Sequence, residues 1–444
     1  MGRPLLTLLA LLTTPSAEAA DLYWGGHYTS RFTAYDSLSL GSENDRAEGL
    51  STALDHRAQL RPTWAISPNI GLHAQLDVFY LQNWGHSPAT YVDPVSGESI
   101  PVASADGIAS AESSLVARAL WADIYAPLGR IRFGRMPVDW GAGIVLNAGQ
   151  DPNSKYGDTS DRIEFTTKVG PMYVEGAYDL ISEGLLGEND DFHVANVALA
   201  WRTENVGIGY LNRYRMQPSN DFGSYLGDIW AKADFGTLSA EVEFAFELGG
   251  GDLSTGANDI DIARWGGNLQ LGAQLGAIQA GVEMGVASGD EDTSDAKLKT
   301  FTFDRDHDVG ILMFEETLPV LEATVMNEST GGRTLDAART GNAVSNAQYL
   351  RPWVSYALRK DLVLTGQLLA ARADKLDESE STGRGYGTEI GLSAAYTPYE
   401  KVTITPAAAL FLPGAYYSEY VDDDLGGAFN GPVYGGRILA TVSF

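Results

Sequence analysis

Apolar and polar side chains alternate along much of the chain. Residues 54–66 and 70–80 each carry mostly apolar side chains at even positions and polar ones at many of the odd positions between them. The turn Ser67–Asn69 separates the two runs. A repeat of two residues places one kind of side chain on each face of a β-strand, so the runs predict a hairpin with one apolar and one polar face. The same unit recurs at residues 238–248 and 263–275.

The connections between these runs are alternately short and long. Tight turns fall at residues 67–69, 126–129, 170–171, 203–205, 235–236, 276, 360–361 and 397–400. Longer polar connections lie near residues 37–51, 85–111, 140–160, 183–191, 217–224, 249–259, 289–346, 374–384 and 414–432. Eight turns and nine loops link 18 strands, and this asymmetry is typical of outer-membrane barrels.

We therefore expect an all-β fold: a transmembrane antiparallel β-barrel with both termini at its periplasmic end and long extracellular loops. A strand pair within residues 289–346 would change the count, so the expected range is roughly 16 to 20 strands. The same loop carries the apolar run 309–325, which predicts that it packs inward or on a partner.

Aromatic residues are placed as such a barrel requires, because rings with one polar edge favour the two membrane–water interfaces. Predicted periplasmic strand ends carry Trp24, Trp64, Trp201, Tyr396 and Phe444, and external ends carry Tyr80, Trp84, Tyr178 and Phe246. The terminal Phe444 resembles the signal read by the barrel-assembly machinery, an expected partner. Pro352 and Pro406 lie inside strands, where each removes a ladder hydrogen bond, so we expect bulges there.

The N-terminus has the pattern of a secretory signal. Arg3 supplies the positive charge, Leu5–Leu12 the apolar segment and Ala17–Ala19 the cleavage site. The expected division is a cleaved signal peptide at residues 1–20 and a barrel at residues 21–444. The expected location is the bacterial outer membrane, in contact with its lipid and lipopolysaccharide.

Charge and composition exclude several kinds of chemistry. A net charge of −28 excludes nucleic acid as a partner, since phosphate binding needs excess Lys and Arg. The absence of Cys excludes disulfides and thiolate metal sites. No Gly-x-Ser-x-Gly motif or other local nucleophile motif occurs, so we expect no enzyme activity.

Acidic loops raise the question of metal ions. The clusters at residues 289–295, 374–380 and 422–424 are candidates for Ca²⁺ or Mg²⁺ that bridge to lipopolysaccharide phosphates, but none has the spacing of a dedicated calcium loop. His307 stands among carboxylates, and an exposed acidic loop is the preferred interpretation over a metal ligand. No other cofactor is expected.

The polar faces of the strands assign charged residues to the lumen. Basic candidates are Arg57, Arg61, Arg130, Arg132, Arg162, Lys168 and Arg213, and acidic candidates are Asp228, Asp234, Glu241, Glu243 and Glu247. In a barrel of 18 strands the eleventh strand faces the second, so Glu241 and Glu243 would oppose Arg57 and Arg61. Such opposed charges would create a transverse field across a constriction. The alternative is that neighbouring Arg–carboxylate pairs neutralise one another.

One segment of about 35 residues resembles a known signature. The strings Arg132–Met136, Trp140–Gly143 and Gly157–Ile163 are similar to the Gly-Arg, Trp-Gly and Asp-x-x-Arg elements around the third loop of 18-stranded bacterial barrels, among them the alginate-export family. The resemblance implies that loop 140–160 folds inward. It also implies that Arg135 and Arg162 line the constriction, with Asp161 as a partner. Met136 replaces the usual Gln, and the lumen is not uniformly basic, so alginate itself is not supported.

Strand parity conflicts with one of these roles. Ile131 and Phe133 point to lipid, so a regular strand would direct Arg135 outward as well, at a cost of roughly 2–4 kcal/mol near mid-membrane. A bulge at Gly134 would turn Arg135 inward. We therefore expect a bulge there.

The expected function is a porin, a passive or substrate-selective channel for small hydrophilic solutes. The second hypothesis is a plugged barrel that acts as a surface binding or structural protein. A polysaccharide exporter and an outer-membrane enzyme rank last. The solute, the direction of transport and the oligomeric state leave no mark in the sequence.

Overall fold

The computed structural model describes most of the barrel and two of its long loops. The described residues are 21–36, 50–83, 90–92, 99–101, 115–182, 191–218, 221–251, 260–292, 295–315, 343–376, 383–421 and 430–444. The predicted signal peptide, the ring of Trp84 and the acidic cluster at 422–424 lie outside them.

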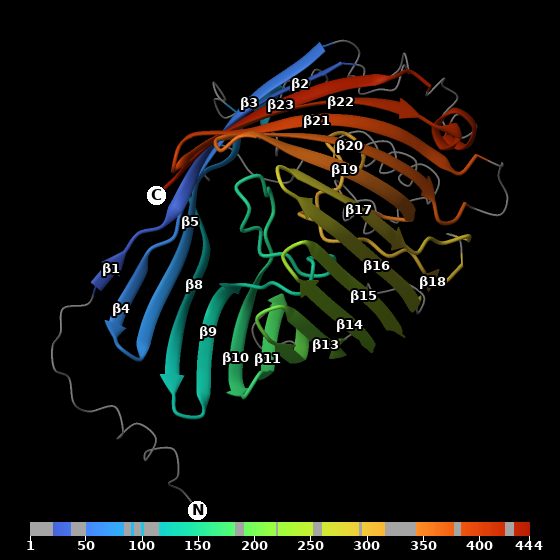
Figure 1. Ribbon diagram of the computed structural model, residues 1–444. Helices are drawn as coiled ribbons and strands as arrows, with labels where there is room; N and C mark the ends of the chain where they lie inside the picture. Colours follow the sequence, from blue (N-terminus) through green and yellow to red (C-terminus); the bar gives the residue numbers. More distant parts are fainter. Residues whose placement is uncertain are drawn as a thin grey trace, which may run out of the picture.

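Eighteen antiparallel strands of the described chain form one closed sheet, and the predicted fold class and strand count are confirmed. Figure 1 shows the strands arranged around a common interior. Each strand pairs with its neighbours in the chain, and the pairing of the first with the last closes the barrel. The strands are β2 (Gly26–Asp36), β3 (Leu50–Leu60), β5 (Ile70–Asn83), β8 (Leu115–Ala126), β9 (Gly129–Pro137), β10 (Thr159–Val169), β11 (Met172–Ser182), β12 (Phe192–Arg202), β13 (Val206–Gln217), β14 (Phe222–Asp234), β15 (Leu238–Gly251), β16 (Ile260–Leu275), β17 (Ile278–Ala287), β19 (Ala347–Arg359), β20 (Leu362–Ala373), β21 (Gly385–Tyr399), β22 (Val402–Pro413) and β23 (Val433–Ser443).

The described chain also contains several short elements. β1 (Asp21–Tyr23) and β4 (Thr63–Ser67) pair with each other, and β4 also pairs with β5. β6 (Thr90–Val92) pairs with β7 (Ser99–Pro101), and β18 (Lys297–Leu298) lies parallel to β16. One π-helical turn covers Tyr416–Val421. In the part of the chain that is described, no helix has the length and apolar character needed to cross a membrane.

The alternation in the sequence becomes an outer and an inner face. On β15, Val242, Phe244 and Leu248 are 41%, 41% and 53% exposed, whereas Glu243 and Glu247 are 0% and 1% exposed. Apolar side chains thus cover the outside, and charged ones are enclosed. An outer surface of this kind fits hydrocarbon, because a soluble protein rarely exposes so large an apolar area.

The bulges predicted at Pro352 and Pro406 are wrong. Pairing runs through Pro352 to β17 and through Pro406 to β23 with no shift of register. Towards β20 and β21, the register is the same before and after each proline. A proline removes one hydrogen bond from the ladder, but that loss does not require an inserted residue.

The apolar core of the barrel lies inside the lumen, on the side of β19–β22. Residues 299–315, which we call the second inner loop, carry buried side chains such as Phe303, Ile311 and Phe314. They belong to one cluster with the inward-facing Tyr386 and Phe411. This part of the lumen is therefore filled by protein. The remainder of the apolar run, residues 316–325, lies outside the described chain.

Candidate constriction of the barrel lumen

A second segment enters the lumen between β9 and β10. Residues 138–158, which we call the first inner loop, lie in the interior of the barrel in Figure 1. At one end of this loop, the Trp140 indole donates a hydrogen bond to Asp228 on β14 at 2.9 Å. The amides of Ala142 and Ile144 donate to the Glu243 carboxylate on β15 at 2.5 and 3.4 Å.

The other end of the first inner loop is held by arginines from distant strands. Arg31 on β2 donates to the Asn153 carbonyl at 2.9 Å, and Arg57 on β3 donates to the Ser154 carbonyl at 2.7 Å. Arg118 on β8 donates to the Gly157 carbonyl at 2.9 Å. Carboxylates therefore hold amides on one side of the lumen and guanidinium groups hold carbonyls on the other, so the loop spans the interior.

The second inner loop braces the first. The Asp306 carboxylate accepts hydrogen bonds from the amides of Lys155, Tyr156 and Gly157 at 2.8, 3.2 and 2.5 Å. The Asp304 amide donates to the Ile144 carbonyl at 2.9 Å. A charged acceptor that satisfies several amides makes a stronger contact than neutral hydrogen bonds, so the two loops form one connected partition.

Two carboxyl groups meet at this seam between the loops. Burial and the neighbouring Asp158 raise the pKa of Asp304 to about 9. Burial also raises the pKa of Asp158, against the hydrogen bond from the Asn147 amide. Like charges at close range cannot both ionise cheaply, so the pair retains a proton at neutral pH.

Most of the predicted luminal charges face inward, and many of them are paired with neighbours. Arg57 lies 3.1 Å from Asp77, which also lies near Arg118 at 3.8 Å. Arg132 contacts both oxygens of Glu164 at 2.8 and 2.6 Å.

The same pattern continues along the wall. Arg162 contacts both oxygens of Asp179 at 2.5 and 2.8 Å. Glu241 accepts hydrogen bonds from the Trp230 indole and the Lys232 ammonium, each at 2.8 Å. Each of these partners points into the lumen, as the predicted residues do. The alternation along the neighbouring strands could therefore have identified them from the sequence. These contacts match the pairwise alternative rather than a purely basic wall opposite an acidic one.

Arg135 and Asp161 are not in the lumen, and the bulge predicted at Gly134 is wrong. β9 pairs with β8 and with β10 in continuous register through this point. Arg135 therefore shares the outer face with Phe133, and its side chain is 54% exposed. Its guanidinium contacts the Asp161 carboxylate at 2.8 Å. A partner in register on the neighbouring strand offsets the cost of an outward charge, so no inserted residue is required.

His307 does not lie in an exposed acidic loop, contrary to the sequence interpretation. It is 8% exposed, and its ring contacts Glu283 at 3.2 Å and Asn268 at 3.4 Å. Among the side chains that the structure describes, no group of three or more His, Cys, Asp or Glu is placed to hold a metal ion. In the acidic cluster at 289–295, Lys299 contacts Glu291 at 3.0 Å and Asp290 at 3.5 Å.

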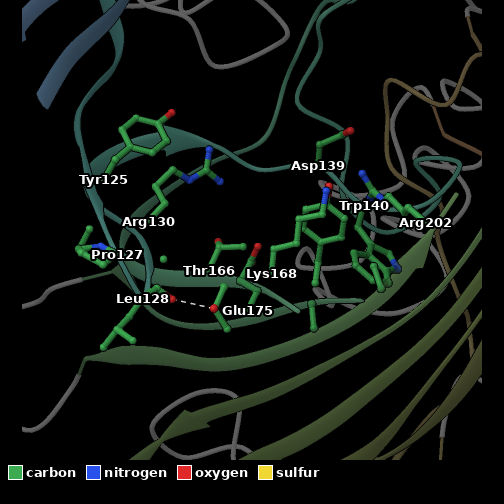
Figure 2. Close-up of a pocket in the computed structure, with 16 residues that line it drawn as sticks. Tyr125, Pro127, Leu128, Arg130, Asp139, Trp140, Thr166, Lys168, Glu175 and Arg202 are labelled. Carbon is green, nitrogen blue, oxygen red and sulfur yellow. Dashed lines mark hydrogen bonds between the residues drawn. The ribbon is translucent and has the colours of Figure 1, made fainter. Parts of the chain in front are cut away.

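The described residues enclose two hollows that adjoin the first inner loop. The larger, of about 790 Å³, lies towards the end of the barrel that carries the tight turns, and Figure 2 shows Arg130, Asp139, Lys168 and Arg202 around it. The smaller, of about 360 Å³, is lined by Arg61 and Arg132 among others. Asp139 is the one residue that lines both.

Three cations of the hollows differ from the paired cations of the wall. Within the described chain, no carboxylate lies at ion-pair distance from Arg61, Lys168 or Arg202. Arg61 donates to the Gln59 amide oxygen at 2.6 Å, the Lys168 ammonium lies 4.9 Å from the Tyr173 ring centre, and Arg202 lies 5.5 Å from the Trp230 ring centre. Their charge remains available to a solute. The inward parity of β12 could have found Arg202, whereas no sequence pattern marked Asp139.

Comparison with known proteins gives no match to any family model or any curated protein sequence. Solved structures do match. OccK9 (OpdG) of Pseudomonas aeruginosa is 12% identical, with a TM-score of 0.58, over 96% of this chain and 99% of that one. A BenF-like porin from Pseudomonas fluorescens Pf-5 is 10% identical, with a TM-score of 0.55, over 96% and 98%. OccAB4 of Acinetobacter baumannii is 9% identical, with a TM-score of 0.53, over 97% and 100%.

These matches extend over nearly the whole barrel, whereas the resemblance to the alginate-export family finds no support in them. At such low identity they establish the architecture. The chain has the fold of an 18-stranded outer-membrane porin.

Proposed function

We propose that this protein is an outer-membrane porin that admits small hydrophilic solutes and favours anions. The observation that carries the proposal is the pair of hollows beside the first inner loop, where Arg61, Lys168 and Arg202 have no carboxylate partner in the described chain. Unpaired cations in a lumen with low-dielectric walls raise the local concentration of anions. The solved porin structures share the fold and support the same function by analogy.

We also propose how the barrel is oriented in the outer membrane and what it contacts there. Tight turns and both described chain ends lie at one end of the barrel, which we assign to the periplasm. The exposed apolar face would contact outer-membrane lipid and lipopolysaccharide. The barrel-assembly machinery would recognise the ring of Phe444, which directly follows β23.

Among the residues predicted for the constriction, we divide the roles by position. Arg61, Arg130 and Arg132 line the hollows and would contact solute. Arg57 and Glu243 hold the first inner loop in place. Arg162 and Glu241 belong to the paired wall, and Arg135 and Asp161 have no part in the passage.

The second candidate is a plugged barrel, and the apolar packing of the second inner loop under β19–β22 favours it. Single-channel recording of the refolded mature chain in a planar bilayer separates the two. Stable current steps are expected for a porin, because the hollows beside the first inner loop would then belong to a continuous path for ions. A bilayer that contains folded barrels but carries no current would identify a plug.

Ion selectivity tests the role of the unpaired cations. The double variant Arg61→Glu and Lys168→Glu reverses one charge in each hollow. We expect the ratio of chloride to potassium permeability to fall by roughly two- to tenfold. The measurement is the reversal potential under a potassium chloride gradient.

The matched control is Arg135→Gln with Asp161→Asn, which removes an ion pair from the outer face. It should leave the reversal potential unchanged. An equal shift in both variants would show that the hollows are not the path of the ions.

A further inference from the structure

We infer that Asp139 is a specificity-determining residue that limits how strongly the passage prefers anions. The inference rests on the proposed porin function and assigns one residue a part in its selectivity. It follows from the position of a single carboxylate in relation to the two hollows.

Asp139 lies where the first inner loop leaves β9. Of the side chains that line the larger and the smaller hollow, it alone lines both. The two hollows therefore adjoin at this carboxylate, and an ion that crossed directly between them would pass it.

The neighbours of Asp139 hold its main chain in place. Val138 is 4% exposed and Trp140 is 8% exposed, and the Trp140 indole is bound to Asp228. Asp139 itself remains exposed between them. A buried residue on each side keeps the carboxylate directed at the passage, as a selectivity group requires.

The charges around Asp139 are mainly positive. Arg61 and Arg132 lie in the smaller hollow, whereas Arg130, Lys168 and Arg202 lie in the larger one with the acidic Glu175. The Asp139 carboxylate accepts a hydrogen bond from the Ala148 amide at 3.4 Å. That contact leaves its negative charge in place, so it lowers the positive potential at the junction.

The test compares Asp139→Asn with the wild type by reversal potential under a potassium chloride gradient. Loss of this charge should raise the ratio of chloride to potassium permeability by roughly two- to fivefold. Asp139→Lys should raise it further. Heat-resistant mobility of the folded barrel in gels verifies that each variant is folded.

The matched control is Asp151→Asn, a loss of the same charge on the same loop. Asp151 lines neither hollow, and its carboxylate accepts a hydrogen bond from the Asn153 amide at 2.7 Å. Equal shifts in the two variants, or a conducting Asp139→Asn barrel with wild-type selectivity, would overturn the inference while the porin function stands. A wild-type barrel that carries no current would overturn the porin function and this inference with it.

Discussion

Glu243 approaches the first inner loop so closely that the loop needs a glycine beside it. A Cβ atom built on Gly141 would lie 2.6 Å from the Glu243 carboxylate, and the φ angle of Gly141 is +61°. Other residue types rarely adopt that conformation, and there is no space for a larger one. One small residue thus allows the amide–carboxylate contact that fastens the loop to β15.

Gly141→Ala should therefore destabilise the folded barrel by at least about 1–2 kcal/mol, from the backbone conformation alone. It should also loosen the first inner loop. The measurements are the temperature at which the barrel loses its heat-resistant gel mobility and the rate of protease cleavage within residues 138–158.

Gly176→Ala is the control, because no atom lies within 4 Å of a Cβ built there. It should leave both measurements near the wild-type values. Equal loss of stability in the two variants would contradict the account of Gly141.

At the scale of elements, the two inner loops act as one partition because carboxyl groups join them. Asp306 satisfies three consecutive amides of the first loop, and the carboxyl groups of Asp158 and Asp304 share the seam. A carboxyl group with a raised pKa stabilises the structure in its protonated form. The contribution of Asp304 is therefore largest below its unfolded pKa of about 3.9 and is lost as pH rises towards about 9.

Raising the pH from 6 to 10 should consequently loosen the seam. Faster hydrogen exchange at the amides of residues 155–157, after correction for the intrinsic pH dependence of exchange, would report it. Asp304→Asn keeps a neutral hydrogen-bonding group and should exchange at a rate that depends far less on pH. A variant with the full wild-type pH response would show that another group controls the seam.

At the scale of the whole molecule, the barrel encloses two different interiors. The side of β19–β22 is packed with the apolar residues of the second inner loop, such as Leu312 and Phe314. The side of β8–β12 keeps the larger hollow with Lys168 and Arg202. The hollow is thereby displaced to one side of the interior, and the proposed passage would lie there.

The strand count, the closed antiparallel sheet and the inward or outward direction of most charged residues could all be predicted from the sequence. These features depend on a repeat of two residues along each strand, which is local and can be read from neighbouring positions. The same alternation predicts Arg135 on the outer face, where the structure places it. The bulge expected at Gly134 contradicted this alternation and was wrong.

Which charges remain free depends on contacts between distant parts of the chain. Whether Arg132 meets Glu164, or Lys168 meets no carboxylate among the described residues, depends on neighbouring strands and on loops that cross the lumen. Asp139 acquires its place from a loop without periodicity, and His307 is buried by residues from several strands. Contacts between segments far apart in the chain have no local period, so the fold could be predicted from the sequence and the passage could not.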